Sequence, residues 1–164
     1  MLMFRSALMV ACLSYATFAA SDPRVTIPVE NLVSMFSEVC LADGLNFVAA
    51  KQRAVSSGEF WTEENGYLLR HRGYSLDVVI EEKIGINKDH DLCAIRSEYD
   101  LYPQSIEQHF TSSISNVAQG EIVKISPKEV TFQLGGAVYY VSLDWNENIK
   151  TVVLMAMRER KQGN

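Results

Sequence analysis

The residues best suited to chemistry are three histidines, because imidazole acts as a general base or metal ligand near neutral pH. His90 lies in Asp89-His90-Asp91, a group that could contribute ligands to a divalent metal. A metal site needs three or four convergent ligands, and such polar residues are also typical of turns. We therefore predict no metal ligand, and we interpret His90 as a turn residue. His71 is interpreted as part of a solvated strand edge.

The sequence lacks the patterns that usually accompany a catalytic serine or a pair of catalytic carboxylates. A serine nucleophile needs a base, an orienting acid and usually a tight turn, and Gly-x-Ser-x-Gly does not occur. Glu81 and Glu82 are neighbours on an expected strand, so they point to opposite faces and cannot act on one substrate. The sequence thus favours a protein without catalytic function and predicts no cofactor. The alternative is a periplasmic hydrolase or metal-dependent enzyme, which requires His71, His90 and an acidic side chain to meet in one cleft.

Aromatic side chains are the remaining candidates for function, because large rings anchor partners at interfaces. The predicted partner surface consists of Phe60, Trp61, Tyr102 and Trp145, which we expect on loops or strand ends. The competing interpretation is that these rings pack against the sheet, where aromatic residues are enriched. The expected partner is a protein or a small-molecule ligand. The net charge of −5 argues against nucleic acid and anionic membranes.

The first twenty residues have the three parts of a secretory signal peptide, which we expect to be removed. Arg5 supplies the positive start, residues 6–20 carry no charge, and small residues close the segment. We predict cleavage after Ala19, with Thr17 as the second small residue, or after Ala20 or Ser21. The apolar run is too short to span a membrane. We therefore predict an exported protein, periplasmic or extracellular, with the bacterial periplasm favoured.

Export predicts that the cysteines form a disulfide, because paired thiols oxidise outside the cytosol. Removal of the leader leaves Cys40 and Cys93, whose separation fits neither a zinc pattern nor a redox motif. Cys40 lies on the apolar face of an expected helix, and Cys93 alternates with Ile95 on an expected strand. We predict one structural disulfide between the two. Free core thiols are the alternative.

The elements that position these residues alternate between helices and hairpins. Helical apolar spacing predicts helices from Pro28 to Cys40, from Asn46 to Val55 and after Pro103. Seven segments have strand character: 67–72, 76–83, 92–99, 121–125, 130–134, 137–143 and 149–157. The order ααβββαββββ predicts an α+β fold with an antiparallel sheet and helices packed on one face.

The length of 164 residues suits one globular domain, which we expect to span residues 21–164 and to end in a short charged tail. The leading hypothesis is an exported, non-catalytic binding module stabilised by one disulfide, and the sequence makes no prediction of its oligomeric state. A third possibility, besides the enzyme, is an acidic cytosolic secretion chaperone. That reading requires an N-terminus that is not cleaved.

Overall fold

The computed structural model describes residues 25–62, 68–84, 90–117 and 121–159. The predicted leader, with Thr17, Ala19 and Ala20, lies outside the described residues, as do residues 160–164 of the predicted tail.

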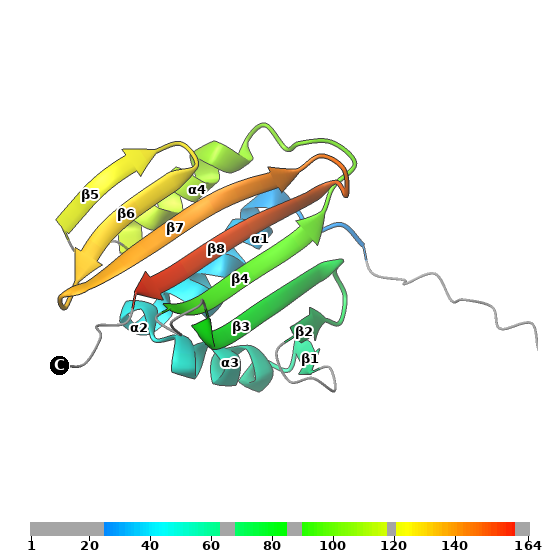
Figure 1. Cartoon of the computed structure of the whole chain (residues 1–164). Coiled ribbons are helices and arrows are strands. Elements are labelled where there is room, and N and C mark those ends of the chain that lie inside the picture. Colours follow the sequence, from blue (N-terminus) through cyan, green and yellow to red (C-terminus); the bar gives the residue numbers. More distant parts are fainter. Residues whose placement is uncertain (1–24, 63–67, 85–89, 118–120, 160–164) are drawn as a thin grey trace, which may run out of the picture.

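All strands of the described residues belong to one sheet, in which neighbouring strands are antiparallel and follow the order β1-β2-β3-β4-β8-β7-β6-β5. Figure 1 shows the helices on one side of this sheet, with its other face turned to the viewer. The strands are β1 (Phe60–Thr62), β2 (Leu68–His71), β3 (Leu76–Ile84), β4 (His90–Glu98), β5 (Glu121–Ser126), β6 (Glu129–Leu134), β7 (Ala137–Asn146) and β8 (Thr151–Glu159).

The helical layer begins with α1 (Val29–Phe36), which continues through a π-helical turn, η1 (Ser37–Leu41), into the short α2 (Ala42–Leu45). Then follow α3 (Phe47–Ser56) and, after the first four strands, α4 (Ile106–Val117). The Asn46 side chain caps α3 by accepting a hydrogen bond from the Ala49 amide. The predicted α+β class, the one-sided helices and the element order are confirmed.

The core lies between the helices and the alternate residues of the central strands that face them. Val78, Ile95, Leu154 and Leu143 form one buried row across β3, β4, β8 and β7, as the strand registers require. From the helices, α1 contributes Phe36 and α4 contributes Phe110, both fully buried. Period-two alternation along the strands and helical spacing in α1 and α4 therefore meet in one core.

The predicted disulfide is confirmed. Cys40 in η1 and Cys93 in β4 are joined, with 5.5 Å between their Cα atoms, and both are fully buried. This bond ties the end of the first helical segment to the centre of the sheet.

A charged pair lies near the disulfide on the same face of the sheet. Asp91 on β4 is fully buried and accepts a hydrogen bond from Arg158 on β8, its register partner. The Arg158 guanidinium also lies 5.8 Å from the centre of the Phe47 ring. The positive charge of Arg158 offsets the cost of burying this carboxylate, so β8 supplies a partner to β4.

Some local predictions need correction. Phe60–Thr62 lies outside the predicted strands but forms β1, and β7 continues through Asp144, Trp145 and Asn146, beyond the predicted strand 137–143. Val55 was expected on the buried face of α3 and is exposed, because Ala54 is the last residue of that helix to reach the core.

Candidate functional site

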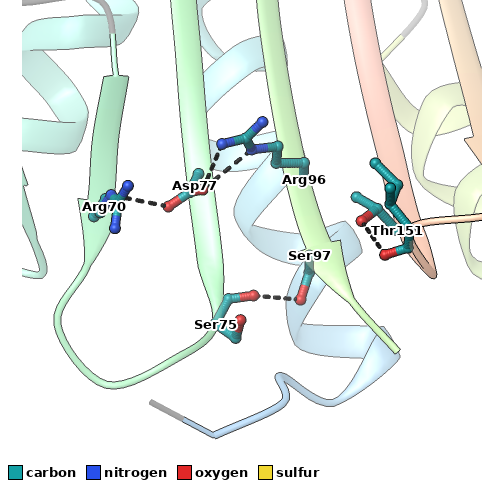
Figure 2. Close-up of polar contacts among 7 residues, drawn as sticks. Arg70, Ser75, Asp77, Arg96, Ser97 and Thr151 are labelled. Atoms are coloured by element: carbon teal, nitrogen blue, oxygen red, sulfur yellow. Dashed lines mark hydrogen bonds and ion pairs between the residues drawn. The ribbon is translucent and has the colours of Figure 1, made fainter. Parts of the chain in front are cut away.

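A hollow of about 380 Å³ lies at one end of the sheet, where β3, β4 and β8 meet the turn before β8. Figure 2 shows the polar side chains that surround it. Its lining residues are Ser75, Asp77, Arg96, Ser97, Glu98, Ile149, Thr151 and Val153. The hollow is therefore built by the consecutive strands β3 and β4 and by β8, which is adjacent to β4 in the sheet but distant in the sequence.

Three charged residues form a row beside the hollow on the face of the sheet that carries no helix. Arg70, Asp77 and Arg96 are in register on β2, β3 and β4. Arg96 donates through Nε and Nη2 to one oxygen of Asp77, at 3.1 and 3.0 Å, and Arg70 Nε lies 3.9 Å from the other oxygen. The Asp77 side chain is 16% exposed, whereas Arg96 is 48% exposed. The carboxylate thus holds the Arg96 guanidinium at the edge of the hollow and lies beside that of Arg70.

The row extends to an exposed ring on the edge strand. Trp61 on β1 is in register with Arg70, whose guanidinium lies 5.8 Å from the centre of the indole ring. Trp61 is therefore the one member of the predicted aromatic surface that adjoins this site.

Two hydroxyl groups of the hollow are hydrogen-bonded to the backbone. Ser97 Oγ donates to the Ser75 carbonyl at 2.7 Å, and Thr151 Oγ1 donates to the Ile149 carbonyl at 3.0 Å. Both residues are buried. A nucleophilic hydroxyl must give its proton to a base, and these protons are held by carbonyl oxygens. The Asp77 carboxylate is likewise paired with Arg96.

A second hollow, of about 460 Å³, adjoins the first and shares Ser75, Glu98 and Ile149 with it. Ile149 lies between the two and is 63% exposed. The turn that carries it is attached to β4, because the Tyr99 amide donates to the Lys150 carbonyl at 2.9 Å. Lys150 itself has a φ of 50°, in the left-handed region that lysine rarely adopts. The turn is therefore held in place by the strand that it covers.

Tyr99 lines this second hollow and is oriented by the N-terminal segment. Its hydroxyl donates to the Ile27 carbonyl at 2.9 Å. Burial raises the pKa of Tyr99 to about 12, so the phenol is protonated at neutral pH. It acts there as a structural hydrogen-bond donor.

Beyond the hollow, the helix-free face becomes apolar. Register places Leu68, Val79, Ala94 and Met155 in one row across β2, β3, β4 and β8. A second row contains Leu92, Met157 and Tyr140, with Glu81 at its β3 end. These side chains alternate with the core residues, so they point away from the helices. We call the two rows the open-face band; within the described ranges no helix covers it (Figure 1).

The remaining predicted surface aromatics lie elsewhere. Phe60 is buried, so it is removed from the predicted partner surface. Tyr102 and Trp145 contact each other on the helix side, with 5.8 Å between ring centres, and both pack against the core. The Tyr102 hydroxyl donates to Glu107 at 2.8 Å, and burial together with that carboxylate raises its pKa. The four predicted aromatic residues do not form one surface.

The histidines do not converge either. His71 was expected at a solvated edge but is buried between Phe60 and Tyr74, and its Nδ1 accepts hydrogen bonds from the Gly73 and Tyr74 amides. His90 lies at the start of β4, six positions before Arg96, and so at the opposite end of the strand. Among the described residues, no group of three or more His, Cys, Asp or Glu side chains could hold a metal ion.

Sequence reasoning missed Arg70, Asp77 and Arg96, since each alone looks like an ordinary surface charge. The available signal was that all three lie at alternating polar positions of consecutive predicted strands. Only the strand register brings them into one row.

Fold and site together define an α+β domain with an eight-stranded antiparallel sheet, one disulfide and an apolar and charged face opposite the helices. No described helix is long and apolar enough to cross a membrane. No family model, curated protein or solved structure matches the chain.

Proposed function

We propose that this protein is an exported, non-catalytic binding module that contacts a protein partner through the open-face band and the adjoining hollow. The observation that supports the proposal is the juxtaposition of fixed arginines with an apolar surface on the helix-free side of the sheet. Apolar side chains supply most of the binding free energy at interfaces, and arginine is enriched where that free energy is concentrated.

The extent of the surface favours a protein over a small molecule. The open-face band crosses five strands, from β2 to β7, and so extends well beyond the hollow at its end, whose volume alone lies in the range of small-ligand sites. Ser97 and Thr151 already donate to carbonyls, so few hydroxyl donors remain to orient a small ligand there.

Export is supported by the disulfide and by the leader pattern of the sequence. A buried bond between Cys40 and Cys93 is typical of a protein that folds in an oxidising compartment.

Site-specific cross-linking tests the proposal. A photoreactive phenylalanine analogue replaces Val153, which lines the hollow, and in a control protein it replaces Val48, which is exposed on α3. We expect a discrete cross-linked species with another protein of the same compartment from position 153 only. Adding Arg96→Glu should lower its yield at least about fivefold, because the charge at the edge of the hollow is reversed.

Equal cross-linking from both positions would show non-specific contact and contradict the proposal. A discrete product that is insensitive to Arg96→Glu would contradict the role of the arginine row. Turnover of a generic ester or peptide by the purified protein would favour the enzyme hypothesis instead.

A further inference from the structure

The strand β5 forms one edge of the sheet and carries three exposed apolar side chains. Ile122, Val123 and Ile125 are 44%, 60% and 53% exposed. Its neighbour on one side is β6, and on the other side no described strand pairs with it. Edge strands of native proteins are usually short or carry charges that discourage pairing with another chain. The strand does carry Lys124 and a bulge, yet half of its six residues are exposed aliphatic side chains.

The two isoleucines lie on the same face of the sheet as the core. Ile122 is opposite Phe132, and Ile125 is opposite Val130; both residues of β6 are buried. Residues three apart on a regular strand would point to opposite faces. Here a register shift between Ile122 and Lys124 places Val123 as an extra residue, which returns Ile125 to the core face. The core-facing side of the sheet therefore extends to β5, where its apolar side chains are exposed to solvent.

We propose that β5 pairs with β5 of a second copy of this chain, in antiparallel orientation about a two-fold axis. The axis passes between Val123 and Lys124, so that Ile122 of each copy lies opposite Ile125 of the other. In this register all six residues of the strand are paired. Each core-facing isoleucine meets a core-facing isoleucine, and the two sheets become continuous.

The neighbouring registers fit less well. A shift by one residue places Ile122 opposite Lys124, which points to the other face because it is in register with Thr131. In the proposed register Lys124 lies close to the axis in both copies. Its ammonium is 2.8 Å from Glu129 of its own chain, so that the two lysines are neutralised locally. The strand is thus complementary to itself, and this favours a second copy over an unrelated strand.

Sedimentation of the purified, oxidised protein tests the proposal over concentrations from about 1 µM to about 1 mM. We expect a reversible monomer–dimer equilibrium. Ile125→Lys should raise the dimer dissociation constant at least about tenfold, because it places a charge in the shared apolar row. Val48→Lys is the matched control, since Val48 is 66% exposed and lies on α3, away from β5 and from the two hollows. It should leave the equilibrium unchanged.

The register is tested by mixing two cysteine variants under mild oxidation. Ile122→Cys and Ile125→Cys should cross-link when mixed, because these positions face each other across the axis. Ile122→Cys alone should not, because its two copies lie about 10 Å apart along the strands, beyond the reach of a disulfide. Circular dichroism confirms that each variant is folded.

A protein that stays monomeric over this range overturns the proposal, as does a dimer that Ile125→Lys leaves intact. A dimer in which Ile122→Cys alone cross-links as efficiently as the mixture overturns the register. A monomer that instead binds an added apolar peptide along β5 identifies a foreign strand as the occupant. None of these outcomes changes the result expected for cross-linking from position 153. The β5 dimer and the partner-binding function are therefore tested independently.

Discussion

The Tyr99 hydroxyl links the end of β4 to the segment that precedes α1, through its hydrogen bond to the Ile27 carbonyl. Folding removes this phenol from water, which disfavours the phenolate and raises the pKa from 10.0 to about 12. The protonated form therefore contributes to the stability of the folded chain. That contribution is complete below about pH 10 and is lost as the pH rises through about 12.

Tyr99→Phe should consequently alter both the stability and its pH dependence. At pH 8 we expect the variant to be less stable by about 1 kcal/mol, because one buried hydrogen bond is lost. Between pH 10 and 12 the wild-type protein should lose about 2 kcal/mol that the variant does not lose. Urea unfolding at several pH values measures both effects.

The control for this experiment is Tyr140→Phe, on the open-face band, which should retain the wild-type loss of stability at high pH. An unchanged alkaline slope in Tyr99→Phe would contradict the assignment of that loss to Tyr99.

Single residues also show how far the sequence could define the site. The disulfide was predictable, because Cys40 and Cys93 each lie at an apolar position of an element with clear periodicity. The environment of His71 was not predictable, because its burial depends on Phe60 and Tyr74, which reach it from other segments. The row of Arg70, Asp77 and Arg96 likewise depends on a register that no single strand encodes.

At the scale of elements, the disulfide connects η1 with β4 and so attaches the first helical layer to the sheet. The bond closes a loop of about 54 residues. This cross-link lowers the conformational entropy of the unfolded chain and so stabilises the folded state by about 4 kcal/mol. The covalent link encloses α2, α3 and the first three strands.

We expect the double variant Cys40→Ala, Cys93→Ala to lose about 4 kcal/mol in its free energy of unfolding, measured with urea. The wild-type protein under a reducing agent should show a loss of similar size. The double variant serves as the control for the reductant, since it should not respond. A difference below about 1 kcal/mol between oxidised and reduced wild type would argue against a stabilising role.

Elements with strong periodicity were predicted well. The stripe Ile106, Phe110 and Ile114 defines α4, and Gly135-Gly136, both with positive φ, forms the expected hairpin between β6 and β7. Short or irregular elements were not. β1 has three residues, too few for alternation to be visible, and α1 changes to a π-helical turn without any sequence signal.

For the molecule as a whole, the two proposals use different parts of one sheet. The open-face band and its hollow are centred on β3, β4 and β8, whereas β5 lies at the far edge. A dimer formed through β5 would present two copies of the band on one continuous surface. Such a dimer would bind more tightly to a partner that presents two copies of its own binding surface, although each single interface would stay the same.

The proposed export makes a prediction for the intact protein isolated from the envelope or medium. Its mass should correspond to a chain that begins at Ala20, Ser21 or Asp22, and reduction should add two hydrogens, about 2 Da. A variant with Leu8→Arg and Met9→Arg should remain in the cytosol, because the apolar run is interrupted. Its chain should begin at Met1 with all three cysteines, Cys12, Cys40 and Cys93, reduced. A wild-type chain that begins at Met1 would favour the cytosolic chaperone hypothesis.

The position of β8 between β4 and β7 has a consequence for how the chain acquires its structure as it emerges from a ribosome or a translocation channel. The segment up to Glu98 can form its hairpins and oxidise its cysteines early, yet one side of β4 stays unpaired until the last strand arrives. The hydrogen bond between Arg158 and Asp91 also forms only when β8 is added. Completion of the sheet is therefore a late, long-range event, and premature termination before residue 151 would leave two half-sheets with no strand to join them.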